Sequence, residues 1–169
     1  APGISIVLDE ATTVARANGP FNRVLKATLR SAFHDSATTA VTLSLPRGVT
    51  ADSTTRTITL APGSTRTLAF KLQGRLPRGA HQVTATARAR GGEYRTGYIP
   101  IEYPHINPQR IYRPSTLTIS ATDVVLPPKL NVAYVPGVGD NVAPVLQQLG
   151  VPITILDPDD PPRNNPSRF

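Results

Sequence analysis

The sequence predicts a mainly β protein, in which an antiparallel β-sandwich is followed by the first part of an α/β domain. Short runs that alternate apolar and polar residues recur up to about residue 103, with turn residues between them. This regular spacing of strands and turns is typical of an all-β sandwich. No helical period occurs before residue 140, and from residue 129 two compact apolar runs flank one helical stripe.

Residues 57–72 are the clearest piece of this pattern. Ile58 and Leu60 alternate with threonines, and after the turn residues Pro62-Gly63 the alternation resumes with apolar side chains at Leu68, Phe70 and Leu72. A period of two buries one face of a strand. Because proline cannot donate to a ladder and glycine adopts positive φ, Pro62-Gly63 predicts a reversal. We therefore expect a strand pair whose apolar face is covered by a second sheet.

The remaining strands of the sandwich are expected on either side of this pair. They are predicted at residues 3–9, 20–30, 40–45, 79–90 and 93–103, with Gly91-Gly92 as a hairpin turn between the last two. Five prolines then surround one β-like run at 115–126. Because prolines favour sheet edges and extended connections, we interpret this segment as a linker that adds an edge strand.

The last part of the chain predicts a β-α-β unit. A β-branched run at 130–135 and a second apolar run at 151–156 flank a helical stripe formed by Val142, Val145, Leu146 and Leu149. Such a unit implies parallel strands. A parallel sheet needs more strands than the proline-rich tail from Asp157 can supply, so we expect the chain to stop inside this domain. The predicted division is a sandwich at 1–106, a proline-rich linker at 107–128 and an incomplete α/β domain at 129–169.

Composition limits the classes of function. The 169 residues carry a net charge of +7, no cysteine and only three lysines. Without cysteine there are no disulfides, thiolate metal sites or cysteine nucleophiles. The arginines are scattered singly and no basic run is interleaved with aromatics, so we predict no nucleic-acid binding. No apolar run is long enough for a membrane-spanning helix.

Motifs that would carry chemistry are incomplete. Gly137-Val-Gly-Asp140 lies where a first βα turn binds phosphate, but Val142 replaces the third glycine of the dinucleotide fingerprint, so we expect a helix cap instead. No serine stands in a Gly-x-Ser-x-Gly elbow. The histidines lack the spacing of metal ligands, and the acidic tail lacks the glycine and glutamate of a calcium loop. These groups are His34, His81, His105, Asp157, Asp159 and Asp160. We therefore predict no catalytic residue, no bound metal and no cofactor in this chain.

Tyrosines and arginines between residues 94 and 112 are the one candidate binding region. The predicted ligand-binding residues are Tyr94, Arg95, Tyr98 and Tyr103, and Tyr112 follows nearby. Aromatic rings beside arginines can bind sugars or extended ligands. The alternative is that these tyrosines pack on the sheet with their hydroxyls at its rim.

The order of several motifs resembles a known family. Leu60-Ala-Pro-Gly-Ser64 and Pro77-Arg-Gly-Ala80 resemble Ig-like accessory modules of the NEW3 or CARDB type. The later motifs are more specific, and they resemble the C-terminal part of multidomain LmbE-like (PIG-L) N-acetylglucosaminyl deacetylases. They are Ile101-Glu-Tyr-Pro-His-Ile106, Ile111-Tyr-Arg-Pro114, Val132-Ala-Tyr-Val-Pro-Gly-Val-Gly-Asp-Asn-Val142 and Leu149-Gly-Val-Pro-Ile-Thr-Ile-Leu-Asp157.

The resemblance implies a non-catalytic accessory region of a hydrolase that acts on N-acetylated sugars. In that family a zinc-dependent catalytic domain precedes an Ig-like sandwich and a glutamine-amidotransferase-like (flavodoxin-like) α/β domain. The implied partner is therefore a deacetylase domain in cis, and zinc is expected in that domain. The family's His-Pro-Asp-Asp motif is absent here, because Asp157-Pro-Asp-Asp160 lacks the leading histidine. No catalytic residue is carried over.

Two other functions stay open. The chain could be a stand-alone binding module for glycans or polyanions that uses the tyrosine–arginine region. It could also be an enzyme whose α/β half acts on a nucleotide or small molecule. Many Ig-like modules work outside the cytoplasm, and this analogy favours a periplasmic or secreted location.

Overall fold

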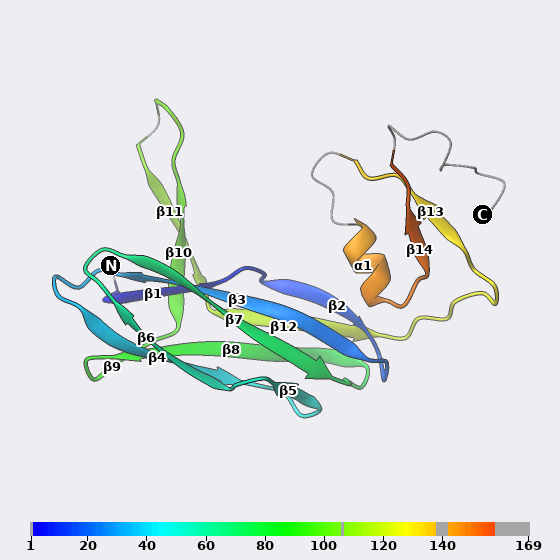
Figure 1. The fold of residues 1–169 in the computed structure, drawn as a ribbon, viewed down its shortest axis with the longest axis horizontal. Coiled ribbons are helices and arrows are strands. Elements are labelled where there is room, and N and C mark those ends of the chain that lie inside the picture. The colour runs from blue at the N-terminus through cyan, green and yellow to red at the C-terminus, as the bar shows by residue number, and fades with distance from the viewer. Residues whose placement is uncertain (1, 106, 138–141, 158–169) are drawn as a thin grey trace.

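The computed structural model describes residues 2–105, 107–137 and 142–157, and its main body is an Ig-like β-sandwich (Figure 1). One sheet has the order β1 (Ile4–Leu8), β3 (Phe21–Ser31), β7 (Thr65–Gly74) and β5 (Val49–Ala51). The other has the order β2 (Thr12–Arg16), β12 (Thr116–Thr122), β8 (Gly79–Ala89), β4 (Ala37–Ser44) and β6 (Thr55–Leu60), with β9 (Gly92–Tyr94) paired to β8. These pairs are antiparallel except β2–β12, which is parallel.

The core lies between the two sheets and follows the predicted alternation. In β3 the inward residues Leu25, Ala27 and Leu29 are buried. In β8 every second residue from Val83 to Ala89 is buried. Residues of both sheets therefore form one apolar cluster, as expected when each strand buries one face. The prediction of a mainly β sandwich is confirmed.

The two strands predicted at 57–72 exist, but they are not paired with each other. β6 pairs with β4 in one sheet, whereas β7 pairs with β3 and β5 in the other. The turn between them crosses the sandwich, and it is closed by a 3.1 Å hydrogen bond from the Ser64 amide to the Ala61 carbonyl, with Gly63 at φ 64°. The prediction of a strand pair was wrong in its pairing, because alternation identifies the buried face of a strand and not its neighbour.

The β-like run at 115–126 contains β12, and its predicted place at a sheet edge was also wrong. β12 lies inside the six-stranded sheet, between β2 and β8. Its prolines lie outside the strand, so each backbone N–H of β12 is free to join a ladder. Leu117, Ile119 and Ala121 are buried on its inner face. This strand is thus part of the sandwich rather than of a linker.

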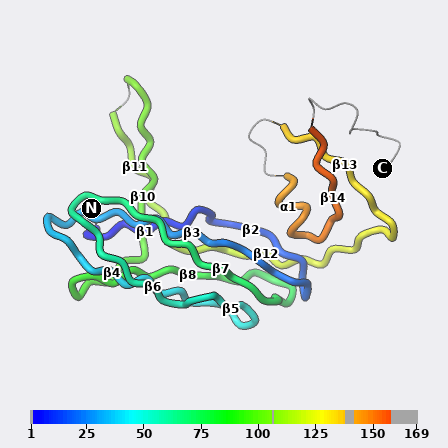
Figure 2. Tube along the Cα trace, in the orientation of Figure 1, coloured from blue at the N-terminus to red at the C-terminus, as the bar shows by residue number. Residues whose placement is uncertain are grey.

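The return strand expected at 93–103 is divided in two. β9 continues the hairpin from β8, whereas β10 (Thr96–Ile101) leaves the sheet and pairs with β11 (Gln109–Pro114). We call β10 and β11 together the ribbon. It projects away from the sandwich near the N-terminal end of the chain (Figures 1 and 2).

The C-terminal segment forms the predicted β-α-β unit. β13 (Val132–Tyr134) and β14 (Ile153–Ile155) pair in parallel, and α1 (Val142–Gln148) lies between them in the chain. The residues of the helical stripe are only partly covered: Val142 and Val145 are exposed, Leu146 and Leu149 are half-buried, and Ala143 is the buried residue of α1. A two-stranded sheet offers too little surface to cover the stripe. Most of the glycine turn, at 138–141, lies outside the described residues, as do Asp159 and Asp160 of the tail.

Candidate functional site

The four predicted binding residues do not form one site. Tyr94 in β9 turns toward the sandwich, where its ring packs edge-on against Phe33 with ring centroids 6.4 Å apart. Tyr94 is half-buried and belongs to the rim of the core. For this residue the structural alternative, a tyrosine packed on the sheet, describes the observed contact.

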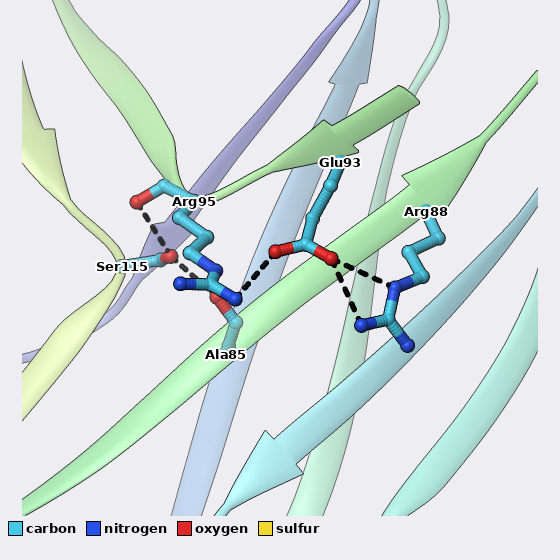
Figure 3. A network of polar contacts seen from close by, with 5 residues as sticks. All are labelled: Ala85, Arg88, Glu93, Arg95 and Ser115. Carbon is cyan, nitrogen blue, oxygen red and sulfur yellow. Dashed lines mark hydrogen bonds and ion pairs between the residues drawn. The ribbon is translucent and has the colours of Figure 1, made fainter. Parts of the chain in front are cut away.

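Arg95 is engaged in a polar network at the base of the ribbon (Figure 3). Its guanidinium forms an ion pair with Glu93, whose other carboxylate oxygen accepts hydrogen bonds from Nε and Nη2 of Arg88 at 3.0 and 2.8 Å. The side-chain hydrogen bond from Arg88, together with the charges of both arginines, holds the pKa of Glu93 below its ordinary value. Arg95 thus has an acidic partner within the chain, which it shares with Arg88.

Ser115 connects this network to the sandwich. Its side chain is fully buried between β11 and β12, and Oγ lies 2.6 Å from the carbonyl oxygen of Ala85 and 2.9 Å from that of Arg95 (Figure 3). The Ser115 amide also donates to the Arg95 carbonyl at 2.9 Å. Ser115 therefore fixes the point where both strands of the ribbon leave the sheet.

The ribbon is also held where β10 passes β1. A Cβ added at Gly97 would lie 2.3 Å from the carbonyl oxygen of Ile6, so only glycine allows this approach. The amide of Tyr98 donates to Oγ of Ser5 at 3.1 Å, and the Arg113 guanidinium donates to the carbonyl of Leu8. The first residues of β10 are therefore fixed in position on β1.

A second group of side chains gathers above this crossing. The register of the ribbon places Tyr98 opposite Tyr112, and their ring centroids are 5.8 Å apart at an interplanar angle of 57°. The guanidinium carbon of Arg110 lies 4.6 Å from the centroid of Tyr98, and that of Arg30, from β3, lies 5.7 Å from it. We call these four residues the Tyr98 cluster. Both distances are within the range of cation–π contact.

The charges of the Tyr98 cluster are not balanced locally. Within the described residues, no carboxylate forms an ion pair with Arg30 or Arg110, whereas six other arginines have acidic partners. Tyr112 exposes 51% of its surface. The cluster therefore presents an open ring beside two positive charges that lack a counterion in this part of the chain.

Of the predicted residues, only Tyr98 belongs to this cluster. Tyr103 follows β10 and is 64% exposed, and no ring contact is found for it in the described part of the chain. Arg30 was missed because it is 68 residues from Tyr98 in sequence and comes close only through the pairing of β3 with β1. The sequence did contain a signal for Arg110 and Tyr112. If residues 109–114 pair with 96–101, strand alternation places both side chains on the same face as Tyr98.

The other candidate groups remain apart. In the described ranges, no three His, Cys, Asp or Glu side chains come together as a metal site. Nε2 of His81 lies 2.8 Å from the carbonyl oxygen of Pro77, and this contact occupies that ring nitrogen. In the same part of the chain no helix is long and apolar enough to cross a membrane.

A groove of about 680 Å³ separates the sandwich from α1. Threonines of β2 and β12 line one side, and Val145 and Gln148 of α1 line the other. At its end Arg23 forms an ion pair with Glu10, and the Gln148 amide lies 3.1 Å from the hydroxyl of Thr13. The described residues that line the groove include no histidine or cysteine.

Comparison with known proteins finds similarity in structure but none in sequence family. No protein-family model matches the chain, and no curated protein matches it. A Salmonella alpha-2-macroglobulin has a TM-score of 0.48 at 13% identity over 72% of this chain, which spans only 7% of that protein. A FixG-related protein from Vibrio parahaemolyticus has 0.42 at 11% identity, covering 70% of this chain and 94% of the other.

A PapD-like domain of human CEP192 has a TM-score of 0.36 at 9% identity, covering 74% of this chain and 90% of the other. The fold follows from the strand pairing described above, and these similarities carry no statement about activity.

Proposed function

We propose that this chain is a non-catalytic accessory region of a zinc-dependent deacetylase that acts on N-acetylated sugars, with the catalytic domain joined in cis. The observation that carries the proposal is the order of its motifs. The sandwich with its 60–64 turn comes first, the 101–106 and 111–114 motifs follow, and the β-α-β unit with its 132–142 and 149–157 motifs comes last. This order resembles the C-terminal part of LmbE-like (PIG-L) deacetylases.

In this proposal the sandwich acts as a rigid spacer. Its strands bury their inner faces in one core and are joined by continuous ladders, so it would fix the separation between a preceding catalytic domain and the α/β segment. Zinc and the catalytic residues belong to the catalytic domain. The chain itself contributes positioning and stability to the whole protein.

The test starts from the coding sequence upstream of Ala1. We expect a His-Pro-Asp-Asp motif within an α/β domain there, and deacetylation of an N-acetylglucosaminyl substrate by the complete protein. Mutation of that histidine should abolish acetate release, and residues 1–169 alone should release none. An upstream region without the motif, or a complete protein without deacetylase activity, would contradict the proposal.

A second candidate function is a binding module for glycans or polyanions. The observation that favours it is the Tyr98 cluster, where the half-exposed Tyr112 packs on Tyr98 and two arginines contact the Tyr98 ring without acidic partners in the described residues. Pull-down on immobilised glycans tests it. Tyr98→Ala should reduce retention, whereas Arg95→Ala should not, because Glu93 already binds Arg95. No retention at millimolar ligand would remove this candidate.

A further inference from the structure

We propose that the Tyr98 cluster binds an acidic polysaccharide, with anionic groups of the sugar chain at Arg30 and Arg110 and one sugar ring stacked on Tyr112. The proposal rests on the second candidate function and specifies its ligand and residues. The shared chemistry is a carboxylate or sulfate group carried on a sugar ring.

The first argument is charge. Arg30 and Arg110 contact the same Tyr98 ring, at 5.7 and 4.6 Å, so two positive charges adjoin one ring. No carboxylate of the described residues pairs with either one. An anionic group would supply the counterion and accept charge-assisted hydrogen bonds from the guanidinium groups.

The second argument is the aromatic surface. Tyr98 is half-buried and contacts both arginines, whereas Tyr112 is 51% exposed and tilted by 57° to it. A tyrosine ring offers an apolar face with a polar hydroxyl at its tip. That combination suits the mixed apolar and hydroxyl surface of a sugar ring.

The third argument is rigidity. The residues that carry the cluster are fixed by contacts at the base of the ribbon, where Gly97 lies against Ile6 and the amide of Tyr98 donates to Ser5. Arg30 is in β3, which pairs with both β1 and β7. A site whose parts are already held in place loses less entropy on binding.

The opposite face of the ribbon bears on whether the ligand is a glycan or a protein. Register places the apolar residues Ile99 and Ile111 there, 40% and 54% exposed, away from the Tyr98–Tyr112 pair. The exposed Ile99 and Ile111 would suit the apolar centre of a protein interface, and they lie on the face away from the cluster. We assign the cluster to an acidic glycan, whose ring would stack on Tyr112. Because tyrosine and arginine are also common in protein interfaces, a polyglutamate peptide tests the alternative.

The experiment titrates the 169-residue chain by calorimetry with three probes: an oligogalacturonate, its neutral methyl ester and a sulfated oligosaccharide of similar length. We expect the acidic probes to bind, the ester to bind at least about tenfold more weakly, and added salt to weaken the acidic complexes. Binding of only one acidic probe would identify the anionic group. Equal affinity for the ester would overturn the proposal.

Variants locate the site. Arg30→Gln and Arg110→Gln should each lower affinity about tenfold, and Tyr112→Ala should lower it several-fold. Arg47→Gln, an exposed arginine in the turn before β5, is the matched control and should bind like the parent chain. Thermal unfolding checks that each variant is folded. Equal losses in the Arg47 and Arg110 variants would mean non-specific charge attraction and would overturn the site.

A polyglutamate peptide of matched charge tests the competing partner. If it binds as tightly as the oligogalacturonate and Tyr112→Ala leaves both affinities unchanged, the ligand is an acidic protein segment and the proposal is wrong. These readouts are independent of deacetylase activity. Failure here therefore leaves the accessory role untouched, and failure of the accessory role leaves this site untouched.

Discussion

Gly97 of β10 lies directly on the backbone of Ile6 in β1, where a single added Cβ would come 2.3 Å from the Ile6 carbonyl oxygen and 2.4 Å from Cγ2 of Val7. Gly97 is also buried. This contact sets the place where the ribbon leaves the sandwich. It therefore also sets where Tyr98, the next residue, meets Arg30.

Gly97→Ala should displace β10 from β1. Its Cβ would meet backbone atoms that cannot rotate away, so we expect a loss of about 1–3 kcal/mol in the free energy of unfolding, as for other overpacked sites. Urea denaturation measures this loss. Thr96→Ala, at the exposed preceding residue, is the control and should stay within about 0.5 kcal/mol of the parent. Equal stability of the two variants would show that β10 does not depend on this approach.

Ser115→Ala should loosen the base of the ribbon. The substitution removes a buried hydroxyl that lies 2.6 Å from the Ala85 carbonyl and 2.9 Å from the Arg95 carbonyl, at an expected cost of about 1–3 kcal/mol. Relative to the parent, hydrogen exchange in the variant should accelerate more at ribbon amides than at β3 amides. The control is Ser120→Ala, an exposed serine of β12. Unchanged ribbon protection in the Ser115 variant would contradict this role.

Phe70→Ala should destabilise the sandwich as a whole. Phe70 is fully buried in the core, so its removal leaves a cavity, and we expect a cost of about 3–5 kcal/mol. Chemical denaturation measures it, with Thr65→Ala, exposed at the start of the same strand, as the control. A Phe70 variant within 1 kcal/mol of the parent, on the scale of ordinary surface substitutions, would be incompatible with this packing.

Acid should weaken the corner between β5 and β6. The Asp52 carboxylate accepts hydrogen bonds from the amides of Lys71 and Ser53 at 3.0 and 2.9 Å and pairs with Arg56. The Lys71 amide is the largest cause that holds the pKa of Asp52 below its ordinary value, followed by the Ser53 amide and Arg56. A lowered carboxyl pKa contributes stability above the unfolded value and loses it as pH falls through the folded value.

The parent chain should therefore lose stability as pH falls below about 4, the ordinary range of an aspartate. Asp52→Asn should be less stable than the parent at pH 6 and should lose less stability on acidification. Urea midpoints at pH 6, 5, 4 and 3 compare the two slopes. The pKa of Glu93 is lowered as well, chiefly by its hydrogen bond from Arg88, so Glu93→Gln should change the slope in the same direction. Parallel curves for the parent and both variants would refute the linkage.

The sequence was informative wherever a pattern depends on neighbours along the chain. Alternation in residues 20–30 and 79–90 predicted the buried faces of β3 and β8, and the two apolar runs around a helical stripe predicted the parallel pair β13–β14. It was uninformative about strand partners, as the β6–β7 turn and the interior place of β12 show. The prediction of the binding residues was limited in the same way, since only Tyr98 of the four predicted residues lies in the cluster.

By itself, then, the sequence determined the class of fold, because burial of one strand face requires a period of two that can be read locally. It also indicated a part of the core, including Leu60 and Phe70. Only the tertiary structure decided that these two residues belong to opposite sheets, and that Arg30 comes to lie over Tyr98. Both facts depend on contacts between residues far apart in the chain, which no local pattern encodes.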